Sequence, residues 1–213
     1  MIKGIIFDLD GTTIDTLNEL YISINQTLKN YGYPTKTKDE VRLGVGRGFR
    51  KLVETVVPEK LSEEKMAEIG RDYQESYTQN YLKSTVYPEI PELLRKLQDR
   101  GILLAVNSNK SDRFTKALIA KNYPDIRFTA VYGRREGVPL KPDPTTAKEI
   151  ADLMGLKTEE VLYVGDSDVD MRTGINAGMK TAGCLWGFRD RKTLTEAGAD
   201  FILEKPEDLL KLL

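Results

Sequence analysis

The sequence has no histidine among its 213 residues, and this absence excludes several classes of enzyme. A Ser-His-Asp or Cys-His nucleophile, a histidine-ligated zinc ion and a phosphohistidine intermediate all require that residue. Acid–base chemistry must therefore use carboxylates, lysine, tyrosine or cysteine. Cysteine is almost as scarce, because Cys184 is the only one. An internal disulfide is thus impossible, and we expect a reducing, cytoplasmic location.

The sequence also lacks an excess of either charge, and it lacks long hydrophobic runs. Lys and Arg together number 32 and Asp and Glu 33, so the net charge is −1. This balance gives no reason to expect a nucleic-acid or membrane partner. No apolar run approaches the roughly 20 residues that a membrane-spanning helix needs. With 40% hydrophobic and 31% charged residues, we expect an ordinary folded protein, as a monomer or equally as a homodimer.

Apolar segments alternate with segments of helical periodicity over most of the chain. Strands are predicted at 5–7, 102–106, 128–132, 161–164, 181–185 and 201–203. Their short apolar runs indicate strands that are covered on both faces. The predicted helices between them are 91–100, 111–122, 144–154 and 168–177, with Ser111 and Asp168 as expected N-caps. This alternation predicts an α/β fold with a doubly wound parallel sheet. Residues after Trp186 are assigned to closing that sheet.

Residues 16–83 break the alternation, because they contain no convincing strand. Helices are predicted there at 17–30, at 37–56 with an interruption at 44–48, and at 62–82. The sequence therefore predicts an α/β core of residues 1–15 and 84–213 and an inserted all-helical cap of residues 16–83. We expect the cap to lie over the carboxyl ends of the strands, where open α/β sheets bind their ligands.

Two carboxylates, Asp8 and Asp10, directly follow the first predicted strand, and Gly11 then turns the chain. Side-chain alternation predicts that both carboxylates point the same way at the carboxyl end of that strand. Two like charges this close need a cation or a shared proton. A capped loop after a buried strand is the structural alternative.

A second acidic cluster follows the predicted strand 161–164 and contains Asp166, Asp168 and Asp170. Mg²⁺ prefers oxygen ligands and keeps several waters, so one or two carboxylates suffice to bind it. Asp166 lies closest to the strand end and is the predicted ligand. Asp170 lies one helical turn further on and is expected to orient the ligands around the metal.

Two weaker signals lie between these acidic clusters. Ser108 and Asn109 follow the predicted strand 102–106 and precede a helix, so they can hydrogen-bond an anion. Lys141 is followed by Pro142 and Pro144, which stiffen the backbone and fix where the lysine points. Each signal is weak when taken alone, and an ordinary polar turn is the favoured alternative for Ser108 and Asn109.

Taken in order, Asp8-x-Asp10, Ser108, Lys141 and Gly165-Asp166-x-x-x-Asp170 resemble the four motifs of the haloacid dehalogenase superfamily. The resemblance is closest to its phosphoglycolate-phosphatase-like members. It covers essentially the whole chain, including the helical insertion in the position of a mobile cap. It implies a Rossmann-like core and a magnesium-dependent phosphatase that acts on a small phosphorylated metabolite, with 2-phosphoglycolate as the candidate substrate.

The resemblance also implies roles for the acidic residues. Asp8 would be the nucleophile and form an aspartyl-phosphate. Asp10 would protonate the leaving oxygen and then deprotonate the attacking water. Mg²⁺ would be held by Asp8, by the backbone carbonyl of Asp10 and by Asp166, with Asp170 orienting that shell. True dehalogenases lack the second Asp, so Asp10 favours phosphate esters.

The remaining roles implied by the resemblance concern the substrate. Ser108 and Asn109 would bind the phosphoryl group, and Lys141 would place a fixed positive charge beside it. Residues 42–51 of the predicted cap include four basic residues and no acidic one, and Arg47 among them, which is flanked by glycines, is the predicted contact to an anionic part of the substrate. A solvated helix face is the alternative for Arg47.

Two other functions stay open at this point. The first is a β-phosphoglucomutase-like phosphosugar enzyme, although such relatives usually use a cap histidine that this chain cannot supply. The second is a phospho-accepting, receiver-like signalling module, which would also place Asp, Ser or Thr, and Lys at strand ends with magnesium. Receiver modules are shorter, however, and have no helical lid.

Overall fold

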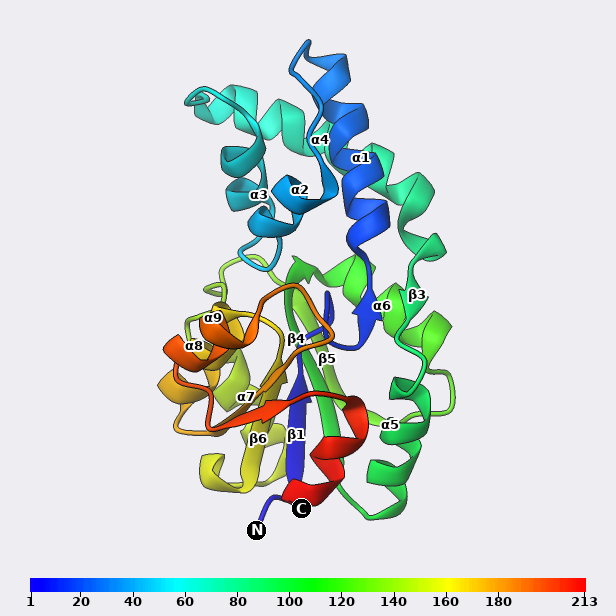
Figure 1. Cartoon of the computed structure of the whole chain (residues 1–213), viewed down its shortest axis with the longest axis vertical. Coiled ribbons are helices and arrows are strands. Elements are labelled where there is room, and N and C mark those ends of the chain that lie inside the picture. The colour runs from blue at the N-terminus through cyan, green and yellow to red at the C-terminus, as the bar shows by residue number, and fades with distance from the viewer.

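A six-stranded parallel sheet forms the lower part of the molecule, and a group of helices lies beyond one end of its strands (Figure 1). The computed structural model describes residues 1–213. The strand order is β5-β4-β1-β6-β7-β8. The strands are β1 Gly4–Phe7, β4 Leu103–Ser111, β5 Phe128–Arg134, β6 Val161–Gly165, β7 Lys180–Cys184 and β8 Phe201–Leu203. The predicted doubly wound α/β fold is confirmed.

The central position of β1 determines what meets at the carboxyl edge of the sheet. β1 pairs with β4 on one side and with β6 on the other, and Phe7 lies beside both Val106 and Val164. The residues that follow these three positions therefore emerge next to one another. The strand order also reverses at β1, and open α/β sheets bind ligands at such a switch point.

Helices cover both faces of the sheet, because its strands are apolar on both sides. Along β1, Ile5 and Phe7 pack into one buried cluster with residues of α5 and α6, whereas Ile6 packs into another with residues of α7 and α8. The helices and 3₁₀ turns of this part are α5 Ile90–Asp99, α6 Asp112–Asn122, α7 Thr145–Met154, η2 Thr158–Glu160, α8 Asp168–Ala177, α9 Arg191–Glu196 and η3 Pro206–Leu212.

The second part, which we call the helical unit, consists of α1 Leu17–Asn30, α2 Lys38–Gly44, α3 Phe49–Val56, α4 Glu63–Asn80 and η1 Tyr81–Lys83. It has its own buried cluster, to which the sheet part contributes Phe114 and Phe188. The chain enters and leaves this unit through a short antiparallel ribbon of β2 Ile14–Asp15 and β3 Thr85–Val86. None of the helices combines the length and apolarity needed to cross a bilayer.

Local details of the predicted elements need correction. The β2–β3 ribbon was not predicted, because strands of two residues are too short to show a periodicity. Ser111 lies at the predicted N-cap position of α6, but it also ends β4, and its side chain makes no capping hydrogen bond. Ser167, not Asp168, caps α8: its hydroxyl accepts the Asp170 N–H, and the Asp170 carboxylate accepts the Ser167 N–H at 3.0 Å. This capping box satisfies backbone donors at both positions.

The separate buried clusters predict separate effects of core substitutions. Ile69 is 1% exposed in the cluster of the helical unit, and Leu94 is 0% exposed beneath the sheet. Replacing either residue with Ala should lower the free energy of unfolding by about 2–5 kcal/mol. In amide hydrogen exchange, Ile69→Ala should speed exchange mainly in α1 and α4, and Leu94→Ala mainly in the sheet. Equal acceleration of both parts by Ile69→Ala would contradict this separation.

Candidate active site

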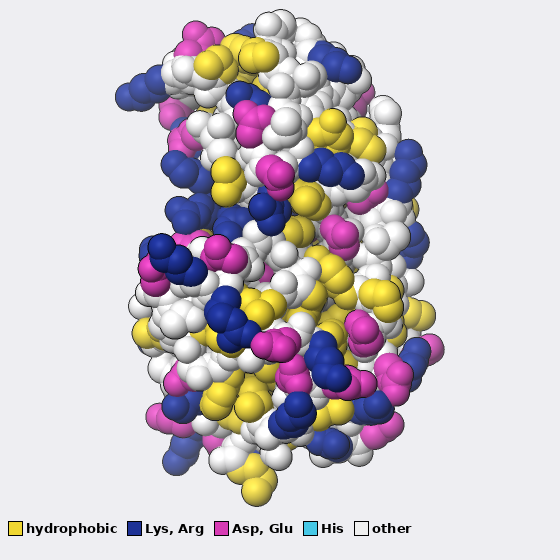
Figure 2. All heavy atoms as spheres, viewed as in Figure 1, with side chains coloured by type: hydrophobic (Ala, Val, Ile, Leu, Met, Phe, Trp, Pro, Cys, Tyr) yellow, Lys and Arg dark blue, Asp and Glu magenta, His cyan; other side chains and the backbone are white.

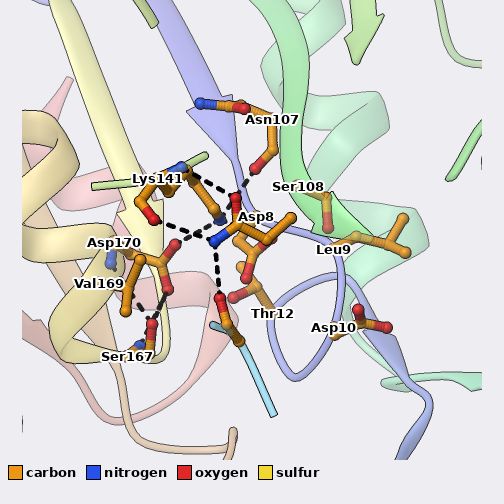
Figure 3. A network of polar contacts seen from close by, with 12 residues as sticks. Asp8, Leu9, Asp10, Thr12, Asn107, Ser108, Lys141, Ser167, Val169 and Asp170 are labelled. Atoms are coloured by element: carbon orange, nitrogen blue, oxygen red, sulfur yellow. Dashed lines mark hydrogen bonds and ion pairs between the residues drawn. The ribbon is translucent and has the colours of Figure 1, made fainter. Parts of the chain in front are cut away.

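Side chains from three neighbouring strand ends converge at the carboxyl edge of the sheet (Figure 3). Asp8 follows β1, Ser108 lies near the end of β4, and Asp166 follows β6. Asp170 comes from the first turn of α8, and Lys141 comes from the segment between β5 and α7. The parallel register of β1 with β4 and β6 brings these residues together although up to 162 positions separate them in sequence (8 to 170).

Three buried carboxylates form the centre of the site. Oxygen atoms of Asp8, Asp166 and Asp170 lie within 4.8 Å of one another. Burial, opposed by the charge of Lys141 and supported by the charges of Asp170 and Asp10, raises the pKa of Asp8 to about 7. Burial and the charges of Asp170 and Asp8 raise the pKa of Asp166 well above its usual value. Such a cluster needs additional positive charge to stay ionised.

The donor set fits a hard divalent cation. Nζ of Lys141 lies 2.9 Å from Oδ1 of Asp8, but without the alignment of a hydrogen bond, so this buried oxygen has no directed partner. An orphaned carboxylate oxygen beside two further carboxylates is the arrangement that Mg²⁺ satisfies, since it binds oxygen ligands and neutralises their charge. The three carboxylates, with one ammonium group among them, therefore leave negative charge that a cation would balance.

Lys141 supplies the one ammonium group inside this cluster. Its Nζ lies 2.7 Å from Oδ1 of Asp170 and donates to the carbonyl of Asn107 at 3.0 Å. Burial lowers the pKa of Lys141, but the charges of Asp170 and Asp8 outweigh burial and hold that pKa well above its usual value. The amide of Asn109 accepts the Lys141 N–H at 2.9 Å and donates to the Lys141 carbonyl at 3.2 Å. Asn109 thus fixes the backbone from which the ammonium projects.

Asp166 is held by donors to both of its oxygens. The hydroxyl of Thr12 donates to Oδ1 at 3.2 Å, and the backbone N–H of Phe188 donates to Oδ2 at 2.7 Å. Gly11 (φ +83°) makes this approach possible, because a Cβ there would lie 2.3 Å from Oδ2 of Asp166. The loop after β1 and the loop after β7 therefore both position this carboxylate.

Asp10 has different partners from Asp8, which corrects the expectation that both carboxylates share one orientation. Figure 3 shows Asp10 lying away from the network around Lys141. Nζ of Lys110 lies 2.8 and 3.0 Å from the two Asp10 oxygens, and the Thr16 hydroxyl donates to Oδ1 at 2.5 Å. Lys110 is almost fully buried and lies 4.8 Å from the centre of the Tyr77 ring.

Sequence reasoning gave Lys110 no role. The lysine belongs to a short polar string, Asn107-Ser108-Asn109-Lys110, which reads as an ordinary turn. The structure shows instead that β4 continues through it to Ser111. The signal that could have identified it was its position. Lys110 lies near the end of a strand that is followed by a helix, next to the predicted anion-binding residues.

A cavity lies between these residues and the helical unit. Asp8, Asp10, Ser108 and Lys110 line it from the sheet side. On the opposite side the lining is largely apolar and includes the stacked rings of Phe49, Tyr73 and Tyr77, with centroids 5.0 and 5.7 Å apart in successive pairs. Any molecule that reaches Asp8 through this cavity therefore contacts both parts of the protein.

The cavity also has an unpaired cation at the end of β5. Arg134 lines the cavity, its side chain is exposed, and it makes no ion pair or side-chain hydrogen bond. Lys110 and Lys141, by contrast, are each neutralised by aspartates. Arg134 is therefore the guanidinium in the cavity that is free to meet an anion, and sequence reasoning did not single it out.

Arg47 lies elsewhere than the sequence analysis expected. Its guanidinium pairs with Asp168 at 2.7 Å, at the N-terminus of α8, and it does not line the cavity. Lys and Arg side chains gather at the boundary between the helical unit and the sheet part (Figure 2). Asp168 forms this ion pair with Arg47 and does not cap its helix. It is not part of the carboxylate cluster that could hold a metal ion.

Comparisons with known proteins agree with this architecture. The family model described as haloacid dehalogenase-like hydrolase matches residues 5–184. A phosphoglycolate phosphatase of Aquifex aeolicus (strain VF5) is 36% identical over 216 residues, which cover 99% of this chain and 96% of that protein. A phosphoglycolate phosphatase of Vibrio cholerae is 31% identical over 220 residues, which cover 100% of this chain and 97% of that protein.

Solved structures show the same fold. The crystal structure of a predicted phosphoglycolate phosphatase from Haemophilus somnus 129pt superposes with a TM-score of 0.91 at 28% identity, covering 99% of this chain and 97% of that one. The fold is also shared with CbbY from Rhodobacter sphaeroides in complex with xylulose-1,5-bisphosphate, with a TM-score of 0.81 at 20% identity over 98% and 96% of the two chains. The chain therefore belongs to the haloacid dehalogenase-like hydrolases, as one of their phosphatases.

Proposed function

We propose that the protein is a magnesium-dependent phosphatase that hydrolyses small phosphate monoesters through an aspartyl-phosphate on Asp8. The observation that carries this proposal is a buried oxygen of Asp8 that has no hydrogen-bond partner. This oxygen lies close to two further carboxylates and beside Lys141. This arrangement supports a cation site built around a nucleophile. Family membership excludes a receiver-like signalling module.

Asp8 and Asp166, with the backbone carbonyl of Asp10, are the residues that would hold Mg²⁺, and Asp170 would orient the shell through Ser167 and Lys141. The bound cation would neutralise the negative charge that otherwise keeps a carboxylate away from a phosphate dianion. Ser108 would donate a hydrogen bond to a phosphoryl oxygen, as would Asn109 if its amide turned from its present partners. Lys141 would stabilise the charge on the phosphoryl group.

The reaction would proceed in two steps. An Asp8 oxygen attacks phosphorus, the ester P–O bond breaks, and Asp10 gives its proton to the leaving oxygen. Asp10 then removes a proton from water, which attacks phosphorus and releases phosphate from Asp8. Since Asp10 is bound by Lys110 and Thr16, it must turn away from these partners to reach the leaving oxygen.

The helical unit would act as a mobile cap, with residues 16–83 as its extent and the β2–β3 ribbon as its hinge. Closure over the carboxyl edge would exclude water during phosphoryl transfer. The two-residue strands of the ribbon support this assignment, because few backbone hydrogen bonds connect the two parts there.

We further propose 2-phosphoglycolate as a substrate. Curated relatives named phosphoglycolate phosphatase align over essentially the whole chain. The unpaired Arg134 at the cavity wall supports a substrate with a second anionic group, since a guanidinium matches the two oxygens of a carboxylate. Arg134 replaces Arg47 as the candidate contact for that group.

Asp8→Asn should abolish magnesium-dependent phosphate release, because an amide oxygen cannot form the aspartyl-phosphate. The rate should fall by a factor of roughly 10³ or more. Release of phosphate from 2-phosphoglycolate is the measurement, and far-ultraviolet circular dichroism checks the fold. Asp152→Asn, an exposed carboxylate on α7, is the matched control and should retain full activity. Substantial turnover by Asp8→Asn would refute the nucleophile assignment.

The stabilisation that Mg²⁺ provides should grow with pH. Burial raises the Asp8 pKa from 3.8 to about 7. Protonation of Asp8 therefore stabilises the folded state fully below pH 3.8, and this stabilisation is lost as the pH rises through about 7. Mg²⁺ competes with that proton for the same oxygens. Thermal unfolding with EDTA or Mg²⁺ should therefore show a larger increase in Tm at about pH 8 than at about pH 5.5. The Asp8→Asn variant should lose most of this difference, and an equal gain at both pH values would contradict the assignment.

Arg134→Gln should raise KM for 2-phosphoglycolate while leaving KM for ethyl phosphate, which lacks the carboxylate, nearly unchanged. Loss of a charge-assisted hydrogen bond predicts an increase of roughly tenfold or more. Arg127→Gln is the matched control, since this exposed arginine precedes the opposite end of β5. Equal increases for both esters would show that Arg134 shapes the cavity without recognising a second charge.

A further inference from the structure

Residues 186–189, which we call the strap, follow β7 and contact the acidic cluster directly. On sequence alone, residues after Trp186 have no role beyond closing the sheet. The indole N–H of Trp186 donates to the carbonyl of Thr12 at 2.9 Å, and the N–H of Phe188 donates to Asp166 at 2.7 Å. A Cβ at Gly187 would lie 2.2 Å from Cβ of Asp166, so only glycine allows this approach. The strap is therefore packed directly against the carboxylate that it holds.

The last residue of the strap reaches the helical unit. The guanidinium of Arg189 donates to the carbonyls of Arg42 at 2.9 Å, of Leu43 at 3.1 Å and of Val45 at 2.9 Å. These carbonyls lie at the C-terminal end of α2, where helices leave acceptors without partners and carry partial negative charge. One side chain of the sheet part thus binds the end of a helix in the other part.

Residues 45–48, which we call the cap loop, follow α2 and have two further polar contacts with the sheet part. The Asn109 amide donates to the carbonyl of Gly46 at 3.0 Å, and Arg47 pairs with Asp168. The Arg47 side chain is 44% exposed, and ion pairs that water reaches contribute little. Arg189 is better shielded and makes three charge-assisted hydrogen bonds, so it is the dominant polar contact.

The strap also contributes apolar packing between the two parts. Phe188, which is 7% exposed, belongs to the buried cluster of the helical unit although it follows a strand of the sheet. Its backbone N–H holds Asp166 while its ring packs beneath the helices. Two adjacent residues, Phe188 and Arg189, therefore join the acidic cluster to the helical unit by independent contacts.

We propose that the strap couples Mg²⁺ binding at Asp166 to docking of the cap loop, with Arg189 as the positioning residue. The inference rests on the proposed function for the identity of the cation. Coupling between two sites is reciprocal, so a cation that fixes Asp166 and the strap favours the docked cap loop, and docking favours cation binding. Arg189 touches no reacting atom and acts through the backbone of α2.

Amide hydrogen exchange of the full chain, with EDTA or with Mg²⁺, tests the coupling. In the wild type, Mg²⁺ should slow exchange in both the strap and the cap loop. In Arg189→Gln, Mg²⁺ should still slow exchange in the strap but no longer in the cap loop. Exchange of the cap loop should become at least tenfold faster than in the wild type, which corresponds to about 1.4 kcal/mol.

Two further variants separate docking from general effects of charge. Arg191→Gln removes an exposed arginine two residues away, which pairs with Glu204, and should behave as the wild type. Arg189→Lys keeps the charge but loses the planar fork, so it should give an intermediate loss of protection. In kinetics, Arg189→Gln should raise KM for 2-phosphoglycolate through the reduced docked population, with a smaller change in kcat.

Several outcomes would overturn the coupling. The first is that Mg²⁺ slows exchange of the cap loop equally in the wild type and in Arg189→Gln. The second is that Mg²⁺ has no effect on exchange in the wild type. The third is that Arg191→Gln removes the protection of the cap loop as strongly as Arg189→Gln does. The proposed function fails separately if the wild type releases no phosphate from any ester while the expected exchange pattern is observed. If Arg189→Gln does not fold, the graded response of Arg189→Lys decides.

Discussion

Three buried carboxylates share a small space with one ammonium group, and much of the surrounding structure serves to hold them there. Asp8, Asp166 and Asp170 lie close enough to repel one another, and Lys141 can balance only one of their charges. Uncompensated charge away from water is costly. The hydroxyls of Thr12 and Ser167 and the N–H of Phe188 keep the oxygens fixed despite this repulsion. Contacts within the protein therefore fix the carboxylates of the proposed cation site.

Parallel topology explains why part of this site was predictable from sequence. Asp8 and Asp166 each follow an apolar run, and the ends of parallel strands meet at one edge, so their proximity follows from the strand pattern. Ser108 follows a third such run. The sheet itself was predictable for the same reason, because buried strands of α/β proteins read as short apolar segments between amphipathic helices.

The unpredicted features depend on contacts between distant segments. Nothing in the local sequence distinguishes Arg47, which pairs with Asp168, from Arg134, which faces the cavity without a partner. Lys110 and Arg189 acquire their roles from Asp10 and from the end of α2, which are 100 and more residues away in sequence. The cap of α8 was misassigned because Ser167 and Asp168 are both good capping residues, and only the backbone geometry selects Ser167.

The β2–β3 ribbon separates the residues of the helical unit from those of the sheet part along the sequence. The chain leaves the sheet part at Asp15 and returns at Thr85, and these two residues are paired neighbours. The residues between them contribute no strand to the six-stranded sheet and none of the four charged groups at its edge. A connection of this kind makes the residues that cover the cavity separable in sequence from those that form its acidic edge.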